Sequence, residues 1–208
     1  MTTDIERALR AAARGAEDPG GAREAARKLS DRAIREGAAD IAFAPVDSPV
    51  GTLLAASTPR GLVTLAYADA GFDPVLERLA VRLSPRIVEA PSALDEVRRE
   101  LDEYFVGMRT DFDLPLDWSL VSDFSRRVLG ATARVGYGEV STYGQIAAQA
   151  GKPSAARAAG RALGANPIPI VVPCHRVVGT SGSLTGYGGG LERKRFLLDL
   201  ESGTRQLG

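Results

Sequence analysis

The chain has one cysteine and one histidine, and they are neighbours, Cys174 and His175. In a chain of this length that order arises by chance about once in two hundred sequences. The thiolate is the nucleophilic form of cysteine, and a nearby imidazole that takes the proton makes it accessible at neutral pH. The apolar run 167–173, with three prolines, predicts a stiff extended backbone that would position a nucleophile. We therefore expect a reactive Cys174 and not an inert core residue.

The histidine needs an acceptor that orients it. In an extended segment consecutive side chains point to opposite faces, so we expect a water, and not a direct hydrogen bond, to join His175 to Cys174. The other ring nitrogen then requires a carboxylate or carbonyl partner. The carboxylates in the C-terminal part of the chain that could serve are Glu139, Glu192, Asp199 and Glu201.

Composition excludes several classes of protein. One cysteine allows no intramolecular disulfide, and one cysteine with one histidine allows no structural zinc site built from several such ligands. No run of about 18 apolar residues is present, which argues against a membrane protein. The N-terminus lacks the apolar segment of a signal peptide. With 44% hydrophobic and 25% charged residues in 208, we expect a globular protein of the cytoplasm.

Charge is distributed unevenly, although the net charge is zero. Residues 124–201 hold ten Lys and Arg and four Asp and Glu, whereas residues 1–123 hold fifteen bases and twenty-two acids. A basic part joined to an acidic part is typical of a protein whose basic part meets a polyanion. Chance variation between solvated surfaces is the alternative, and charge alone does not decide between them.

The elements that must position the Cys-His pair fall into two groups. The first is a surface extension of two helices, broken at residues 18–21, followed by a small α+β domain with an antiparallel meander that ends near Trp118. The expected helices are 4–14, 22–36, 74–83 and 92–105, and the expected strands are 41–46, 51–57, 62–67 and 86–89.

The second group is helical. A cap at Thr142 and the turn at 151–153 between two short helices predict a helix-turn-helix, a DNA-binding arrangement. Its second helix carries Arg157 and Arg161 among small residues, which suits close approach to a groove or tight packing inside the protein. The expected helices are 124–135, 143–150, 154–163 and 191–201, and a glycine-rich loop is expected at 179–190.

Residues 166–177, NPIPIVVPCHRV, closely resemble the signature of the O6-alkylguanine-DNA alkyltransferases, also called methylated-DNA–protein-cysteine methyltransferases. The resemblance covers about residues 40–201 and is strongest from Phe124 onward. It implies an α+β fold, with a ribonuclease-H-like antiparallel sheet followed by a mostly helical domain with the helix-turn-helix. The implied domains are an extension at 1–37, an α+β domain at 38–118, the alkyltransferase domain at 122–201 and a tail at 202–208.

The resemblance also implies a function. Such proteins move methyl and larger alkyl groups from O6 of guanine, and in some cases O4 of thymine, in duplex DNA to a cysteine, after the base is flipped out. Because the thioether is irreversible, each molecule acts once. Double-stranded DNA that contains O6-alkylguanine is the implied partner of a monomeric protein, and no cofactor is implied since the acceptor is the protein itself.

Individual residues match the roles known in that family. Cys174 matches the alkyl acceptor, His175 the histidine that deprotonates it through a water, and Glu201 the glutamate that orients the histidine. Asn166 matches the asparagine that holds the active-site turn. Tyr143 matches the tyrosine that protonates guanine N3 and crowds the phosphate of the target nucleotide.

Further matches concern DNA and the alkylated base. Arg157 matches the arginine that fills the gap left by the flipped base. Gly188 stands where some relatives carry serine, which indicates a looser lid and larger alkyl groups, and the zinc ligands of some relatives are absent. Alongside Arg157 and Tyr143, the implied DNA-binding residues are Ser154, Ala156 and Arg161; the implied substrate-binding residues are Tyr187 with its lid 181–190, Gly188, and the main chain of Val172, Cys174 and Val177.

Three other functions compete with this one. Alkyltransferase-like lesion sensors keep the helix-turn-helix but replace the cysteine, usually by tryptophan, so Cys174 argues against a sensor. A helix-turn-helix transcription regulator does not explain the Cys-His pair as its sole role. A cysteine hydrolase usually draws its histidine from a distant part of the sequence, whereas these two residues are adjacent.

Overall fold

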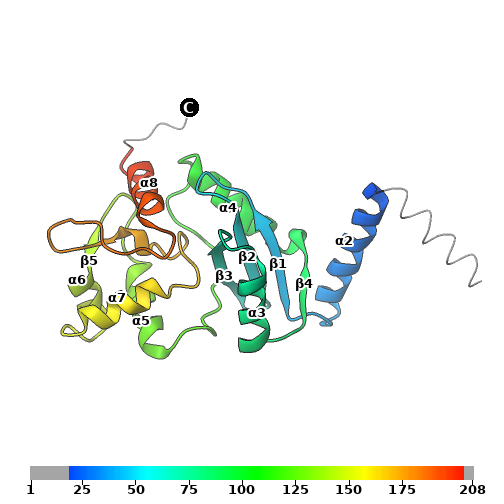
Figure 1. Ribbon diagram of the computed structural model, residues 1–208, viewed down its shortest axis with the longest axis horizontal. Coiled ribbons are helices and arrows are strands. Elements are labelled where there is room, and N and C mark those ends of the chain that lie inside the picture. The colour runs from blue at the N-terminus through cyan, green and yellow to red at the C-terminus, as the bar shows by residue number, and fades with distance from the viewer. Residues whose placement is uncertain (1–18, 204–208) are drawn as a thin grey trace, which may run out of the picture.

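The computed structural model describes residues 19–203, so the helix predicted at 4–14 lies outside the described residues (Figure 1). The N-terminal half contains a four-stranded sheet in the order β3-β2-β1-β4. β1 (Ile41–Val46), β2 (Leu53–Thr58) and β3 (Gly61–Tyr67) pair antiparallel, which confirms the predicted meander. β4 (Ile87–Glu89) adds to the other edge of β1 in parallel.

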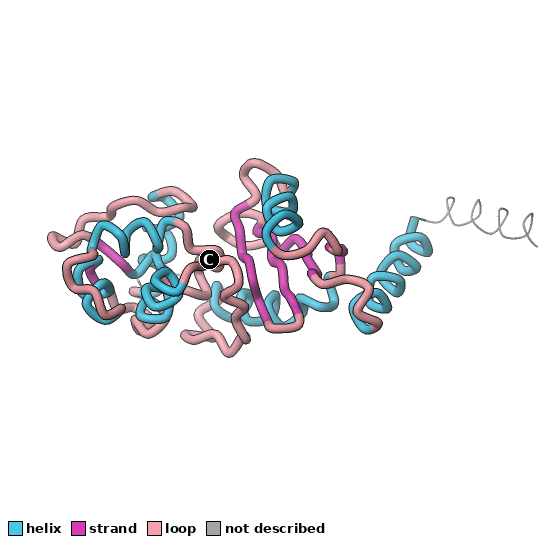
Figure 2. The backbone as a smooth tube through the Cα atoms, turned by 90° about the horizontal axis from the view of Figure 1, so that it is seen from below, coloured by secondary structure: helices cyan, strands magenta, loops and turns pink. Residues whose placement is uncertain are grey.

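Each face of the sheet is covered by a helix, because alternate strand residues point to opposite sides. Ile41 and Leu54 pack with α3 (Asp73–Arg82) in one apolar cluster. The opposite face packs against η1 (Pro91–Leu94) and α4 (Asp95–Phe105), and Figure 2 shows the sheet between the two helices. The apolar stripe predicted for 92–105 is buried here, through Leu94, Val97, Leu101 and Phe105.

The C-terminal half is a helical bundle that shares its core with the α4 face of the sheet. Its helices are α5 (Asp123–Thr132), α6 (Tyr143–Gln149), α7 (Ala156–Gly164) and α8 (Leu191–Glu201). Thr142 caps α6 as predicted: its hydroxyl accepts from the Gln145 amide, and the Gln145 side chain accepts from the Thr142 amide. α6, the intervening turn and α7 form the expected helix-turn-helix, whose helices pack on each other and on α5.

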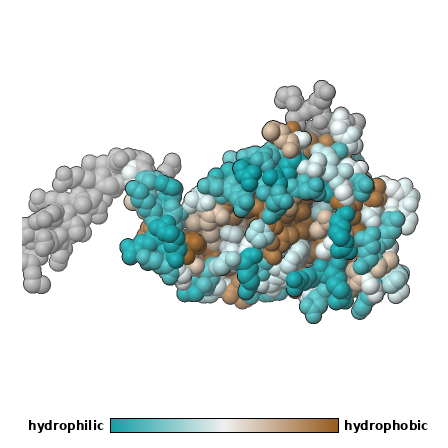
Figure 3. Space-filling model, turned by 180° about the vertical axis from the view of Figure 1, so that it is seen from behind, coloured by the Kyte–Doolittle hydropathy of each residue, from teal (hydrophilic) through white to brown (hydrophobic). Residues whose placement is uncertain are grey.

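Two predicted boundaries were wrong. α2 (Pro19–Arg35) begins inside the expected break at 18–21, because proline is well tolerated in the first turn of a helix. α7 begins at Ala156 and not at Ser154, because the Ala155 amide closes the preceding turn on the Lys152 carbonyl at 2.9 Å. α2 stands beside the sheet, at the end of the molecule opposite the bundle, with a largely hydrophilic surface (Figures 1 and 3).

Within residues 19–203 no helix combines the length and the apolar character that crossing a bilayer requires. In the same range no three Cys, His, Asp or Glu side chains gather into a group suited to a metal ion.

Candidate active site

The segment before the cysteine forms a turn, so the extended conformation expected for 167–173 was wrong. Pro169 and Val172 pair with each other across the turn, and Ile170 has φ of 74°. Proline lacks the amide hydrogen that a strand ladder needs. A β-branched residue at positive φ is strained and persists only where its surroundings hold it, a condition frequent at functional sites. The chain then continues as the 3-10 helix η2 (Cys174–Arg176).

Asn166 holds this turn through three hydrogen bonds. Its Oδ1 accepts from the Ile168 amide at 3.0 Å, and its Nδ2 donates to the Val172 carbonyl at 2.9 Å and to Cys174 Sγ at 3.2 Å. One amide side chain therefore sets both the backbone path and the environment of the sulfur. This is the placement expected for the residue that supports the active site.

Cys174 lies on the wall of a cavity of about 490 Å³ between the two halves of the molecule. Its side chain is 7% exposed. Burial raises the pKa of the thiol to about 11, although the hydrogen bond from Asn166 and the positive charge of Lys194 act in the opposite direction. The sulfur is therefore a neutral thiol at pH 7 and needs a base to become a nucleophile.

Glu201 is the buried acceptor at the centre of the site. Its Oε1 accepts from His175 Nε2 at 2.8 Å and from the Tyr104 hydroxyl at 2.6 Å. Arg176 donates to both carboxylate oxygens at 2.9 Å, and the Gly138 amide donates to Oε2 at 3.3 Å. Burial by itself raises the pKa of this carboxyl, but the hydrogen bonds outweigh it and lower the pKa to about 2. Of the four candidate acceptors, the structure places Glu201 against the histidine.

His175 is fully buried, and burial lowers its pKa although Glu201 favours the charged form. Because an ionised carboxylate only accepts, the ring nitrogen Nε2 carries the hydrogen and Nδ1 carries a lone pair. Nδ1 has no hydrogen-bond partner among residues 19–203. The result is a neutral imidazole whose basic nitrogen is unused by the protein, one residue after the thiol.

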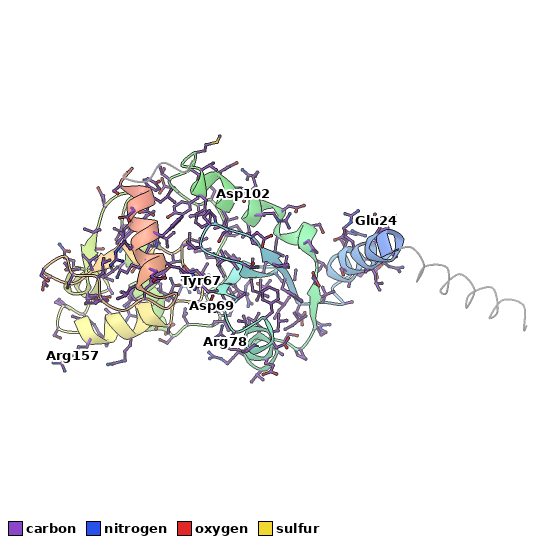
Figure 4. The ribbon with its side chains drawn as sticks, turned by 45° about the horizontal axis from the view of Figure 1, so that its top comes forward. Glu24, Tyr67, Asp69, Arg78, Asp102 and Arg157 are labelled. Carbon is purple, nitrogen blue, oxygen red and sulfur yellow. The ribbon has the colours of Figure 1, made fainter. Side chains whose placement is uncertain are left out.

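A set of contacts fastens the 181–190 loop to the N-terminal half. The hydroxyls of Tyr187 and Tyr67 are 2.8 Å apart, and a Cβ on Gly189 would overlap the Tyr67 ring at 2.3 Å. Arg193 lies 4.4 Å from the centre of the Tyr67 ring and pairs with both oxygens of Asp69 at 2.6 Å. Figure 4 shows Tyr67 and Asp69 close together between the two halves. The loop with Tyr187 and Gly188 thus closes one side of the cavity.

Tyr143, the first residue of α6, is held by the same loop. Its hydroxyl oxygen accepts from Thr185 Oγ1 at 3.1 Å, and its ring lies near Gly160 of α7. The Thr185 carbonyl accepts from the buried Lys194 ammonium at 3.0 Å. Since Thr185 donates to this oxygen, the proton of the Tyr143 hydroxyl is free for another acceptor.

The helix-turn-helix residues lie on the surface. The side chains of Arg157 and Arg161 are exposed and form no hydrogen bond or ion pair within residues 19–203. Ser154 is exposed in the turn, and Ala156 is half-buried at the start of α7. Arg157 points away from the body of the molecule (Figure 4).

Two residues predicted to bind the alkylated base do not line the cavity. Val172 and Val177 are fully buried and do not line the cavity; the carbonyl of Val172 accepts from Asn166, and that of Val177 accepts from Lys194 at 2.6 Å. Sequence reasoning also missed residues that the structure adds. A signal existed for Arg176, which is a charge inside an apolar motif, and for Thr185, which lies in the predicted lid 181–190. The sequence held no such signal for Tyr67, Tyr104 and Lys194.

Comparison with known proteins agrees with this architecture. The family description "6-O-methylguanine DNA methyltransferase, ribonuclease-like domain" matches residues 41–118, and "6-O-methylguanine DNA methyltransferase, DNA binding domain" matches residues 123–203. The methylated-DNA–protein-cysteine methyltransferase of Mycolicibacterium paratuberculosis is 47% identical over 161 residues, 77% of this chain and 92% of that protein. The chain belongs to the O6-methylguanine DNA methyltransferase family.

Other relatives extend the comparison. The inducible methylated-DNA–protein-cysteine methyltransferase of Bacillus subtilis is 40% identical over 70% of this chain and 82% of its own length. The crystal structure of the Mycobacterium tuberculosis O6-methylguanine methyltransferase superposes with a TM-score of 0.69 at 41% identity, over 81% of this chain and 96% of that one. The O6-methylguanine DNA methyltransferase fold predicted from the motif is thereby confirmed, and the activity of the chain is transfer of methyl from O6-methylguanine in DNA to a protein cysteine.

Proposed function

We propose that Cys174 is the methyl acceptor and that His175 and Glu201 prepare it. The observation that carries this is the arrangement around one sulfur: the sole cysteine of the chain lies in the cavity, and the next residue is a neutral histidine braced by a carboxylate. The proton of the thiol passes through a water to His175 Nδ1, and Glu201 stabilises the imidazolium that forms.

The chemistry is a displacement at a saturated carbon. The thiolate forms a bond from Sγ to the methyl carbon while the bond from that carbon to O6 breaks, and the electron pair leaves with guanine. Tyr143 donates its free hydroxyl proton to guanine N3, which makes the base a better leaving group. The thioether cannot be reversed by thiol exchange, so each molecule repairs one lesion.

We further propose that α6 and α7 bind duplex DNA. The Mycobacterium tuberculosis relative has been crystallised in complex with DNA, and Arg157 has no competing partner within residues 19–203. The target atom faces the interior of the duplex, so the nucleotide must be flipped at a cost of a few kcal/mol, and Arg157 fills the vacancy. Ser154, Ala156 and Arg161 approach the backbone beside it.

The cavity supports transfer of groups larger than methyl. A Cβ on Gly188 would meet the Gly164 carbonyl oxygen at 3.6 Å, an ordinary contact. Serine would therefore fit there, and glycine leaves extra room beside Tyr187. The same cavity would also admit O4-alkylthymine, because thymine is a smaller base than guanine. The α+β domain at 38–118 supports the alkyltransferase domain at 122–201, and the protein acts as a cytoplasmic monomer.

Intact-mass measurement after incubation with a duplex that contains O6-methylguanine tests the acceptor. We expect a gain of one methyl group on the peptide with Cys174, and no gain for Cys174→Ser, which still binds DNA. Methyl uptake by Cys174→Ser would overturn the assignment. Binding without any transfer by the unaltered chain would instead select the lesion-sensor function.

A second experiment separates DNA binding from chemistry. Arg157→Ala should slow transfer from duplex DNA more than transfer from free O6-benzylguanine. Arg195→Ala, at an exposed position on α8, is the matched control and should change neither rate. Equal losses on both substrates for Arg157→Ala would contradict the insertion role.

A further inference from the structure

The mouth of the cavity is formed by both halves of the molecule. On one side is the end of α7, with Leu163 and Gly164. On the other side is α3, which contributes Arg78 and Arg82 to the cavity wall. Residues four apart in a helix lie on the same face. The two arginines therefore lie on one face of α3 and line the same cavity as Leu163 and Gly164 of α7.

These arginines differ from their neighbours in charge pairing. Within residues 19–203, the Arg78 side chain makes no hydrogen bond or ion pair, and the Arg82 side chain donates only to the Leu120 carbonyl at 3.3 Å. Both side chains are exposed. Elsewhere in the sheet domain each arginine has a carboxylate partner: Arg60, Arg86, Arg98, Arg99 and Arg109. In an acidic half of the chain, two unpaired cations at a cavity mouth indicate an anionic ligand.

We propose that Arg78 and Arg82 form a phosphate-binding site that holds the backbone of the lesion-bearing strand where the flipped nucleotide enters the cavity. The inference rests on the proposed function, because only a nucleotide attached to its strand brings phosphates to this mouth. The planar guanidinium fork matches phosphate oxygens in geometry and charge. Arg78 and Arg157 lie along the same lower side of the molecule in Figure 4, so one strand can reach both.

The two halves would then have separate tasks on DNA. α7 anchors the duplex, whereas α3 contacts the strand only after the nucleotide has turned into the cavity. Undamaged duplex, in which the base stays stacked for most of the time, would use the α3 site little.

The experiment is the salt dependence of binding for Arg78→Gln/Arg82→Gln, in a Cys174→Ser background so that the methyl group stays on a short O6-methylguanine duplex. Each lost phosphate contact reduces the slope of log K against log salt by about 0.7 to 0.9. Two contacts predict a slope shallower by roughly 1.4 to 1.8 and binding weaker by roughly 15- to 30-fold at 0.15 M salt. The loss should be smaller on undamaged duplex.

Arg35→Gln is the matched control, since Arg35 is an exposed arginine of α2 at the far end of the molecule (Figure 1). It should leave the slope unchanged. With Cys174 present, the double variant should react with free O6-benzylguanine within about twofold of the unaltered rate. An unchanged slope for the double variant would overturn the proposal.

A loss seen only on long DNA that holds several protein molecules would also overturn it, in favour of contact with a neighbouring copy. If the unaltered chain transfers no methyl group, the proposed function fails, and the salt slope still decides the phosphate site separately.

Discussion

Replacing Glu201 by glutamine removes one negative charge from a buried cluster and keeps the shape of the side chain. The carboxylate accepts from His175, from Tyr104, and from Nε and Nη2 of Arg176. Arg176 is itself 4% exposed. In Glu201→Gln its charge stays buried without a counter-ion, and the new amide group can donate toward His175 Nε2.

Two routes give the same magnitude for the loss of stability. A carboxyl whose pKa falls from 4.5 to about 2 on folding stabilises the folded state by roughly 3 kcal/mol at neutral pH. Breaking a buried ion pair from one side costs about 3 to 5 kcal/mol. For a chain of this size that loss lowers the melting temperature by roughly 6 to 20 °C. Donation from the amide to Nε2 also places the ring proton on Nδ1, so methyl transfer should fall at least about 100-fold.

Thermal unfolding followed by circular dichroism and single-turnover transfer from O6-methylguanine DNA measure the two effects. Glu192→Gln, an exposed carboxylate on the first turn of the same helix, is the control and should cost at most about 1 kcal/mol. A melting temperature for Glu201→Gln within about 2 °C of the unaltered chain would refute the reasoning about burial. A normal transfer rate would refute the role of the carboxylate.

The dependence of stability on pH follows with a definite sign. The lowered pKa of Glu201 means that its contribution is present above pH 4.5 and is lost as the pH falls toward 2. The lowered pKa of His175 acts in the same direction, with its loss beginning as the pH falls below 6.5. Urea unfolding at a series of pH values should therefore show falling stability on acidification. The fall in stability should be steepest below pH 4.5, and in Glu201→Gln this part of the curve should be less steep.

Three further predictions follow from the site. Tyr104→Phe removes a buried 2.6 Å hydrogen bond to Glu201. It should lower the free energy of unfolding, measured by urea denaturation, by roughly 1.5 to 3 kcal/mol. An unchanged urea midpoint would contradict this contribution of the hydrogen bond. The pKa of the Cys174 thiol is raised to about 11. The rate of its alkylation by iodoacetamide should therefore rise about tenfold per pH unit between pH 7 and 9. A rate that levels off in that range would contradict the raised pKa. Thr185→Val should slow methyl transfer from duplex DNA, whereas Thr185→Ser keeps the hydroxyl and should retain the normal rate. In a Tyr143→Phe background neither substitution should change the transfer rate. An effect that persists in that background would disprove orientation of Tyr143 by Thr185.

Local patterns were sufficient for much of the fold. Apolar, β-prone runs separated by turn residues located three strands of the sheet, and the Thr142 cap located the start of α6. Two of the expectations that failed involve prolines. Pro19 begins a helix where a break was expected, and the segment with Pro169 turns where an extended run was expected. A proline restricts its own φ and lacks a backbone amide hydrogen. Both the first turn of a helix and a tight turn satisfy these restrictions, so packing decides between them.

The sequence by itself identified the family and predicted the nucleophile and its adjacent base, because these depend on residue identity and short spacing within residues 166–177. Only the tertiary structure decided that Tyr104, nearly one hundred residues upstream, donates to Glu201, and that α3 brings Arg78 to the cavity mouth. It also decided the protonation states of the site. Desolvation and hydrogen bonding set the pKa of a buried group, and both arise only when distant segments pack together.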